Sequence, residues 1–246
     1  MHLILLRHGQ SEWNLENKFT GWKDVSLTEL GIEEAEYSGK IILENQFNIK
    51  SIYTSLLDRA TETTNIVAQI INYPKSQIKK EWRLNERHYG ALEGLNKSET
   101  AKKYGEDQVK IWRRSFDIPP PRLEVSDSRH PKNNNKFSSL ECELPTGESL
   151  KDVINRLKPF LKNYFNFLRK NQNDHLIVAH SNSLRAIVKI LESLSDDEII
   201  EVNIPTGVPL VYKLDNQLSV IEKKYLINEN DLIEKMSIVK NQGKAS

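Results

Sequence analysis

Apolar residues along this chain fall into short runs and helix-spaced patterns that are separated by polar segments. Four consecutive apolar residues at 3–6 predict a strand buried on both faces, since such a strand needs no polar alternation. Residues 51–54 and 176–179 predict further strands. The runs at 208–214 and 218–221 predict a hairpin or an antiparallel edge. These elements indicate an open α/β sheet, which fits one large domain or two small ones.

Helical patterns follow several of the strands. Ser55 and Asp58 resemble a capping box, which predicts that Ser55 caps the helix after 51–54. A strong amphipathic helix is predicted over 148–168, and Pro159 is expected to kink it or split it in two. After the strand at 176–179, apolar residues recur at helical spacing over 184–191.

Two segments lack such patterns. Residues 122–145 are polar and asparagine-rich, so we interpret them as a mobile surface insertion and not as a separate domain. The end of the chain, 228–246, is predicted to be a flexible tail. A short helical turn inside it would be supported by Leu232, Ile233 and Met236. We therefore expect the whole chain, 1–246, to form a single domain.

Composition narrows the class of protein. Hydrophobic residues make up 38% and charged residues 28%, as in ordinary soluble proteins. A formal net charge of +1 argues against nucleic-acid binding, so any anion must be bound by a local cluster of cations. The single cysteine, Cys142, suits a reducing compartment. Because Met1 and His2 lead directly into a strand and no apolar run approaches ~20 residues, we expect a cytoplasmic protein without a signal peptide or membrane span.

Candidate chemistry lies directly after two predicted strands. Arg7, His8 and Gly9 follow the first, and His180 follows the strand at 176–179. If these strands are neighbours in one parallel sheet, both histidines share a cleft at its carboxyl edge. A neutral imidazole is a good nucleophile for phosphorus. The other histidines show no metal-ligand spacing, so a metal site is not expected.

The segment 81–97 is a predicted loop rich in titratable groups. Glu86 within it is an ordinary solvated carboxylate or, beside a bound phosphate, a general acid. Several cations lie at element ends, and each taken alone is better explained as an ordinary surface charge. Together they could clamp a small polyanion. They are Arg7, Arg59, Lys97, Arg113 and Arg114.

These residues occur in motifs that closely resemble the cofactor-dependent phosphoglycerate mutases of the histidine phosphatase superfamily. The resemblance extends from Leu3 to Leu214. The long loop with Glu86 and the paired arginines after Trp112 are its most specific parts. The other matching motifs are Arg7-His8-Gly9, Trp13-Asn14, Thr20-Gly21-Trp22, Arg59-Ala60, Gly94-Leu95-Asn96-Lys97, His180, Asn182-Ser183-Leu184-Arg185-Ala186 and Ile204-Pro205-Thr206-Gly207.

The resemblance implies a glycolytic and gluconeogenic isomerase that interconverts 3-phosphoglycerate and 2-phosphoglycerate. His8 would carry the phosphoryl group, primed by 2,3-bisphosphoglycerate and without a metal. Glu86 would donate and accept protons, while His180 would stabilise the transferring phosphoryl group. Arg7 and Arg59 would hold that group. The residues implied to contact substrate or support its binding are Ser11, Asn14, Thr20, Gly21, Arg87, His88, Tyr89, Lys97, Arg113, Arg114, Ser181 and Asn182.

The same resemblance implies a three-layer α/β/α fold with a mostly parallel sheet and an antiparallel edge strand. It also implies a homodimer or homotetramer that acts on small phosphoglycerates and needs no nucleic acid or membrane. A bisphosphoglycerate synthase or phosphatase on the same scaffold is an alternative, as is a non-catalytic regulator that binds a phosphorylated ligand.

Two positions depart from the family pattern. Gln10 replaces the more usual Glu, which removes a negative charge near the site. Ser181 replaces the Gly that normally follows the second histidine. If that position needs a positive φ or a close approach of the backbone, serine there costs about 1 kcal/mol and alters the neighbouring backbone donor.

Overall fold

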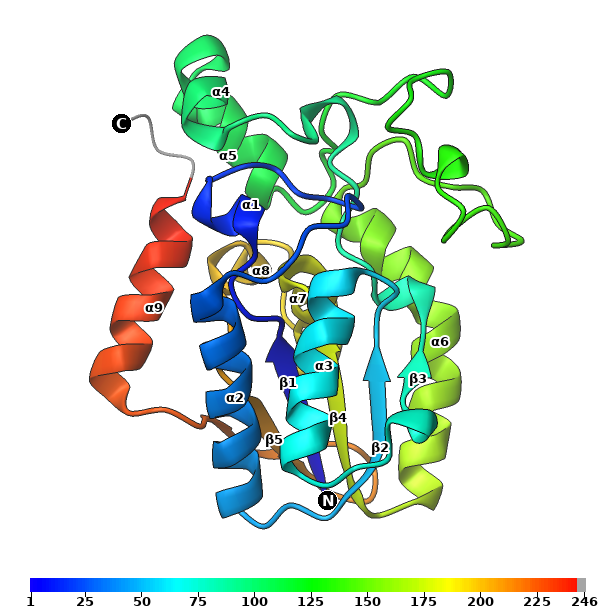
Figure 1. Cartoon of the computed structure of the whole chain (residues 1–246), viewed down its shortest axis with the longest axis vertical. Helices are drawn as coiled ribbons and strands as arrows, with labels where there is room; N and C mark the ends of the chain where they lie inside the picture. The colour runs from blue at the N-terminus through cyan, green and yellow to red at the C-terminus, as the bar shows by residue number, and fades with distance from the viewer. Residues whose placement is uncertain (243–246) are drawn as a thin grey trace.

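A computed structural model describes residues 1–242, whose strands form a six-stranded sheet (Figure 1). The sheet order is β3-β2-β4-β1-β5-β6. The first four of these are parallel, β5 runs antiparallel to β1, and β6 pairs antiparallel with β5. The strands are β1 His2–Arg7, β2 Ile49–Thr54, β3 Lys79–Lys80, β4 Asp174–Ala179, β5 Leu210–Leu214 and β6 Val220–Tyr225. The predicted parallel sheet with an antiparallel edge is confirmed, and the two-residue β3 is an addition to it.

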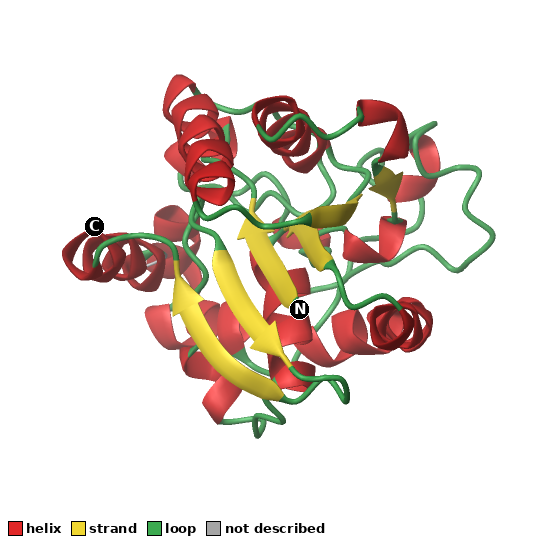
Figure 2. Ribbon diagram, turned by 90° about the horizontal axis from the view of Figure 1, so that it is seen from below, coloured by secondary structure: helices red, strands yellow, loops and turns green. Residues whose placement is uncertain are grey.

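Strand β1 lies inside the sheet, and its successive side chains serve two cores. Leu3 and Leu5 pack with α6 (Leu150–Lys170) and α7 (Ser181–Leu191) on one face. Ile4 and Leu6 pack with α2 (Glu29–Glu44) and α3 (Asp58–Ile70) on the other. This double burial explains the unbroken apolar run, and Figure 2 shows the helices on both sides of the sheet. The three-layer α/β/α prediction is confirmed.

Shorter elements cover the end of the sheet where β1, β2 and β4 finish (Figure 1). Several of them lie in or beside the loop at 81–97 that was predicted to be irregular. They are α1 Glu12–Leu15, η2 Trp82–Leu84, η3 Gly90–Leu92, α4 Lys97–Tyr104, α5 Glu106–Arg114 and α8 Glu198–Glu201. Another short 3-10 helix, η1 Lys75–Gln77, precedes β3.

Pro159 was predicted to kink helix α6 or to split it in two; α6 continues through Pro159, so the split is wrong. A proline removes the N–H that would bond to the carbonyl four residues earlier, here that of Asn155. Both Pro159 and Asn155 are exposed, and water can therefore satisfy the freed carbonyl. The apolar face of the helix, which remains buried, keeps it in one piece.

The predicted cap at Ser55 is also wrong. Helix α3 begins after Leu57, whose side chain makes no cap hydrogen bond. The Ser55 hydroxyl instead lies 2.7 Å from His180 Nε2 and accepts a bond from the Leu57 amide. The Ser55 hydroxyl therefore contacts His180, the residue that follows β4, and does not cap α3.

The segment 122–145 contains one short 3-10 helix among its described residues, η4 Pro131–Asn133. It is irregular, as the sequence predicts, but it is anchored. Phe137 is buried, and its ring centroid lies 4.9 Å from that of Trp22. Lys136 Nζ lies 2.6 Å from carboxylate oxygens of both Asp24 and Asp58. These contacts tie the segment to the loop after α1 and to the start of α3.

The predicted tail is mostly a helix, α9 (Glu229–Asn241). This corrects the expectation of a tail with only a short helical turn; residues 243–246 lie outside the described part of the chain. The Asn228 side chain caps α9 by accepting a bond from the Asp231 amide. Lys235 Nζ lies 2.6 Å from Glu34 Oε1 on α2, which docks the helix. Within residues 1–242, no helix is long and apolar enough to cross a membrane.

Candidate active site

The two histidine-ended strands are neighbours. Strands β1 and β4 pair in parallel with Arg7 opposite Ala179, and the His8 amide donates to the Ala179 carbonyl at 3.0 Å. His8 and His180, which directly follow these two strands, therefore lie at the same edge of the sheet. The ring centroids of His8 and His180 lie 4.9 Å apart. The predicted pairing of these strands is confirmed.

His8 is held as a neutral base. Its Nδ1 lies 2.7 Å from the Gly9 carbonyl, which fixes the proton on Nδ1 and leaves Nε2 free to accept. Arg59 Nε donates to that Nε2 at 3.3 Å. Burial lowers the pKa of His8 well below its usual value, and the charges of Arg59 and Arg7 lower it further. An unprotonated Nε2 facing two guanidinium groups has the features of a nucleophile for a phosphoryl group.

Gly9 and Gly31 allow the segment after His8 to touch the start of α2. A Cβ on Gly9 would lie 2.0 Å from the Gly31 carbonyl oxygen. A Cβ on Gly31 would lie 2.0 Å from the Gln10 carbonyl oxygen. Neither distance is compatible with a side chain, so this backbone contact requires glycine at both positions.

His180 is fully buried and lies at the N-cap position of α7. Ser55 Oγ contacts its Nε2, as described above, while its Nδ1 has no hydrogen-bond partner among the described residues. Burial lowers the pKa of His180 well below its usual value, with further contributions from Arg59 and His8. The site thus contains two neutral imidazoles side by side.

Arg7 and Arg59 are almost completely buried beside them. Arg7 Nη1 donates to the Ile204 carbonyl at 2.9 Å. Arg59 reaches from the start of α3 to the carbonyls of Lys23 and Gly21, at 3.0 and 2.9 Å. Burial lowers the pKa of Arg59 to about 10 despite the attraction of Glu86. These backbone contacts fix both cations close to His8, where an anion would relieve their desolvation.

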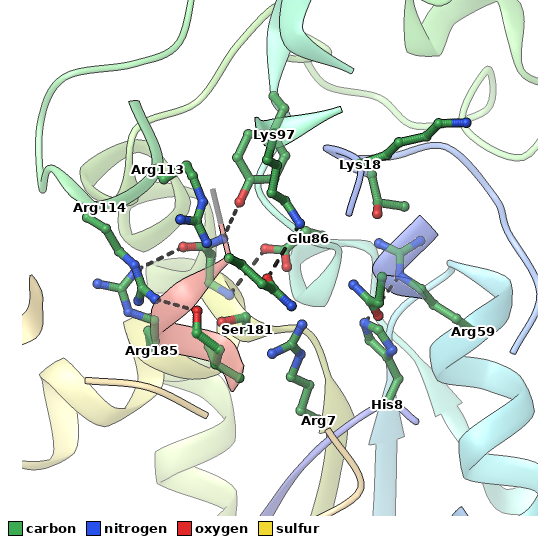
Figure 3. A pocket seen from close by; sticks show the side chains of 16 residues that line it. Arg7, His8, Lys18, Arg59, Glu86, Lys97, Arg113, Arg114, Ser181 and Arg185 are labelled. Atoms are coloured by element: carbon green, nitrogen blue, oxygen red, sulfur yellow. Dashed lines mark hydrogen bonds between the residues drawn. The ribbon is translucent and has the colours of Figure 1, made fainter. Parts of the chain in front are cut away.

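Glu86 lies across the cavity from His8 (Figure 3). Its Oε1 accepts from its neighbour's amide, Arg87 N, at 2.7 Å and from Asn182 N at 3.2 Å. The second bond comes from the start of α7, which joins the loop of Glu86 to the end of β4. The carboxylate is thereby placed in the same cavity as the imidazole of His8.

One cavity collects most of the predicted site residues. Among the described residues, those that line it include seven Arg or Lys side chains and one carboxylate, that of Glu86. The predicted residues that line it are Arg7, His8, Asn14, Thr20, Arg59, Glu86, Tyr89, Lys97, Arg113, Arg114, Ser181 and Asn182. The excess of positive charge is local, as the near-neutral net charge of the whole chain requires for an anion site.

A cation cluster, defined here as Lys97, Arg113 and Arg114, forms the wall opposite His8 (Figure 3). Lys97 is the first residue of α4, and the two arginines end α5. Burial lowers the pKa of Lys97 well below its usual value, and Arg113 and Arg7 lower it further. Burial also lowers the pKa of Arg113 to about 10. Because these cations repel one another, a bound ligand with several negative groups would stabilise the cluster.

Five predicted residues are not among those that line the cavity, and all of them except His88 contact a residue that does. His180 is the first of them. Ser11 caps α1 and holds Asn14 through its hydroxyl. Gly21 has φ +55° and offers its carbonyl to Arg59. Arg87 donates to the Arg113 carbonyl at 2.9 Å, and His88 Nδ1 accepts from Gly90 N. Their support of the site is indirect in this structure.

Ser181 is the first residue of α7 and is not among the residues with positive φ. The strain that a positive φ would cause therefore does not arise at this position. The neighbouring donor, Asn182 N, makes its bond to Glu86. Gln10 is the other departure. Its side-chain Oε1 accepts from the Thr28 hydroxyl at 2.9 Å, and its backbone amide donates to Glu34.

Four residues that line the cavity were not predicted to do so. Two are cations, Lys18 in the loop after α1 and Arg185 on α7. Arg185 lies in a matched motif, and that was an available signal. The other two, Val239 and Gln242, come from the end of α9 and had no signal, because this segment was interpreted as a tail.

The end of α9 narrows the cavity. Gln242 Oε1 lies 3.4 Å from Lys97 Nζ, and the Val239 carbonyl accepts from Arg114 Nη2 at 3.4 Å. The free volume inside is about 50 Å³. Ligand pockets usually measure about 300–1,000 Å³, so an organic ligand requires the cavity to open.

The fold and this site define a phosphoryl-transferring class of protein that uses histidine. The sequence model of the histidine phosphatase superfamily (branch 1) matches residues 3–129 and 124–223. The chain therefore belongs to the histidine phosphatase superfamily.

Two relatives are similar over the whole chain. One, from Hydrogenobaculum sp. (strain Y04AAS1), is 50% identical over 244 residues, and the other, from Treponema denticola, is 51% identical over 245 residues. The aligned region covers 99% of each chain in both cases. Both relatives are named 2,3-bisphosphoglycerate-dependent phosphoglycerate mutase.

Solved structures support the fold. A mycobacterial glucosyl-3-phosphoglycerate phosphatase in complex with VO3 has a TM-score of 0.70 at 19% identity, with 92% of this chain and 98% of that chain covered. Bacillus stearothermophilus YhfR has a TM-score of 0.64 at 24% identity, with 87% and 91% covered. At such identities the likeness concerns the fold.

Proposed function

We propose that this chain is a 2,3-bisphosphoglycerate-dependent phosphoglycerate mutase, an isomerase that interconverts 3-phosphoglycerate and 2-phosphoglycerate in glycolysis and gluconeogenesis. Two full-length relatives at about half identity carry that name. The observation that carries the proposal is one cavity with a neutral His8 on one side and the cation cluster on the other. A substrate with a phosphate and a carboxylate has one group that can react at His8 and another that can bind to the cation cluster.

The donors around this cavity fit a polyanionic primer. Buried nitrogens without hydrogen-bond partners among the described residues include Arg7 Nε, Arg185 Nε and His180 Nδ1. Buried donors without acceptors are costly, and phosphate oxygens would satisfy them. When bound, 2,3-bisphosphoglycerate supplies the phosphoryl group that primes the enzyme. Arg7, Arg59 and the cation cluster would hold it.

His8 carries the covalent step. Its Nε2 lone pair attacks phosphorus as the bond from phosphorus to the leaving oxygen breaks, and the electron pair of that bond goes to the oxygen. Arg7 and Arg59 hold the phosphoryl oxygens, and Nδ1–H of His8 stays on the Gly9 carbonyl as the ring becomes cationic. His180 donates to the transferring group from its unpartnered side. Positioned positive charge of this kind suits a loose phosphoryl-transfer transition state.

Glu86 handles the proton. As the leaving oxygen departs it takes a proton from the Glu86 carboxyl, and in the reverse direction the carboxylate removes a proton from the attacking hydroxyl. This exchange balances each half-reaction without a metal. Asn14 and the Asn182 backbone assist at the phosphoryl group. Thr20, Tyr89 and the cation cluster bind the substrate carboxylate and its second phosphate.

The test is a pair of measurements on the purified chain. Intact mass after addition of 2,3-bisphosphoglycerate is expected to rise by one phosphoryl group, and a coupled enolase assay is expected to show primer-dependent isomerisation. Hydrolysis that outpaces isomerisation would instead favour a bisphosphoglycerate synthase or phosphatase. No phosphoryl gain and no turnover would favour a regulator that binds the ligand without catalysis.

We propose further that the chain acts in the cytoplasm as one domain within a homodimer or homotetramer. The family resemblance supports the assembly, and the sheet that runs through the fold supports the single domain. Sedimentation velocity of the purified protein tests the assembly, and a purely monomeric protein would contradict it.

A further inference from the structure

The loop that carries Glu86 is held from behind by a buried ion pair between Arg156 and Glu148. Arg156 comes from the second turn of α6, and Glu148 directly precedes the helix cap Ser149. Arg156 Nε lies 2.7 Å from Glu148 Oε1, and the two side chains are 7% and 6% exposed. Neither residue lines the cavity. A buried pair of this kind is costly to assemble, which raises the question of what it does.

Arg156 binds the backbone of the loop. Its Nη1 donates to the carbonyls of Arg83 and Asn85, at 2.5 and 3.2 Å. Its Nη2 donates to the carbonyl of Glu86 itself at 3.3 Å. A planar guanidinium can reach several carbonyls at once in a fixed geometry, whereas the single ammonium of lysine has no such fork.

Glu148 completes the grip on the other side of Glu86. Its Oε2 accepts from the His88 amide at 2.8 Å, and its own amide donates to the His88 carbonyl at 2.9 Å. The loop residues on both sides of Glu86 are therefore tied to the beginning of α6. Trp22 adds a bond from Nε1 to the Glu86 carbonyl at 2.6 Å, and Arg156 lies over its ring at 5.7 Å.

We propose that the Arg156–Glu148 pair is a positioning device for the proton-transfer step, which fixes the Glu86 carboxyl relative to His8. This inference rests on the proposed function of Glu86 as acid and base. The pair touches no reacting atom; it acts through the backbone of residues 83–88. Its loss should therefore slow phosphoryl transfers that need a proton from Glu86 and spare transfers that do not.

Two phosphoryl donors separate these cases. The alkoxide that leaves 2,3-bisphosphoglycerate must be protonated, whereas the acetate that leaves acetyl phosphate departs without a proton. In Arg156→Met, we expect phosphorylation of His8 by 2,3-bisphosphoglycerate to fall about 10²-fold, because a small misplacement of a catalytic group has effects of this size. Phosphorylation by acetyl phosphate should stay near the wild-type rate. Intact mass against time measures both.

Controls address folding and charge. Arg156→Met leaves Glu148 buried without its partner, so the double variant Glu148→Gln with Arg156→Met removes both charges and is expected to show the same selective loss. Arg156→Lys keeps the charge and should still be impaired with 2,3-bisphosphoglycerate. Lys158→Met is the matched control and should behave as wild type, since within residues 1–242 this exposed cation on α6 bonds only to Asn155 of its own helix.

Equal losses with both donors, or no loss with either, would overturn the inference. Hydrogen–deuterium exchange of residues 83–88 is a readout that needs no donor, and it should become faster in Arg156→Met and the double variant but not in Lys158→Met. Unchanged exchange would also overturn the inference. A wild-type chain that takes no phosphoryl group from 2,3-bisphosphoglycerate would instead refute the proposed function and with it the role in proton transfer, and exchange would then show only whether the pair holds the loop in place.

Discussion

The two walls of the cavity are built in different ways. On one wall, Arg7 ends β1, His8 follows it, and Arg59 lies in the first turn of the helix after β2. His180, which follows β4, does not line the cavity but lies beside His8. On the other wall, the cation cluster comes from α4 and α5, and the end of α9 closes it. The positions of the residues on the first wall are fixed by the packed core around the sheet. The second depends on segments that pack outside the sheet, so we expect it to adjust as substrate enters.

This difference assigns separate tasks to the two walls. The sheet-borne wall holds groups that must not move while a phosphoryl group is transferred, and their contacts are mainly backbone carbonyls and buried hydroxyls. The outer wall holds long cationic side chains whose partners include the end of α9. Changes in the first should affect the chemical step, and changes in the second should affect binding.

The largest effect is expected from the sheet-borne wall. His8→Gln removes the nucleophile, so phosphoryl gain should be abolished with either donor and turnover should fall by at least about 10⁴-fold. His2→Gln changes a histidine at the other end of the same strand and should leave both measurements unaffected. Phosphoryl gain that survives in His8→Gln, measured by intact mass, would place the reacting group elsewhere and break the comparison.

A smaller and different effect is expected from the outer wall. Arg113→Met removes a charge-assisted contact, and kcat/KM for 3-phosphoglycerate should fall about 10- to 100-fold. Phosphorylation by acetyl phosphate, which lacks a second anionic group, should change little. Lys110→Met removes an exposed cation from the same helix and serves as the control. A loss of equal size with both donors would show that the walls do not have separate tasks.

A third test addresses the loop that joins the walls. Burial lowers the pKa of His88 to about 3, so the unfolded chain, whose histidine pKa is near 6.5, binds more protons between these values. Stability from this group is present above pH 6.5 and is lost as the pH falls towards 3, by up to about 1.4 kcal/mol per pH unit.

His88→Asn keeps an acceptor for Gly90 N and does not titrate. Denaturant unfolding of this variant at several pH values should therefore show a shallower fall in the free energy of unfolding below pH 6.5 than wild type, although the variant is less stable at neutral pH. Parallel pH profiles for the two proteins would contradict the neutral state of His88.

The smallest effect concerns the end of α9. Lys235→Met removes the contact with Glu34 that docks α9 on α2, which is worth about 1 kcal/mol or a fivefold change in an equilibrium. With the helix docked less often, water should reach phosphorylated His8 more often. We expect the phosphoenzyme to hydrolyse a few-fold faster after primer removal. Lys240→Met on an exposed position of α9 is the control, and equal lifetimes in all three proteins would separate α9 from closure.

How much could be predicted from the sequence follows the same division. The runs at 3–6 and 176–179 predicted two strands, because a strand buried on both faces can be apolar throughout. That these strands are neighbours, with a histidine after each at one edge of the sheet, was a hypothesis that the apolar pattern alone does not supply, and the pairing of β1 with β4 confirms it. The positions of Lys97, Arg113 and Arg114 at element ends suggested only a possible clamp for an anion, and the family motifs assigned them to the substrate. Nothing in the pattern of α4 or α5 specifies which way Lys97 or Arg113 points.

The failures have three physical causes. Ser55 fits a helix-cap pattern, yet it lies beside His180, which is 125 residues away in the chain, and no local rule competes with such a contact. Arg156 was overlooked because most of its partners are backbone carbonyls, which every residue possesses. Helix α9 was interpreted as a tail because its apolar pattern is weak, and its polar contacts with Glu34, Lys97 and Arg114 join it to residues far away in the chain.

The contact between Gly9 and Gly31 limits how this enzyme can change over time. Each glycine lies against the other's segment so closely that replacing either one alone pushes a new carbon into backbone oxygen. Replacing both makes the clash worse, so no compensating pair of single steps exists. Random mutagenesis with selection for activity should therefore leave these two positions untouched while neighbouring Gln10 varies. The backbone contact made by the segment after the reactive histidine therefore cannot be altered by stepwise substitution of its two glycines.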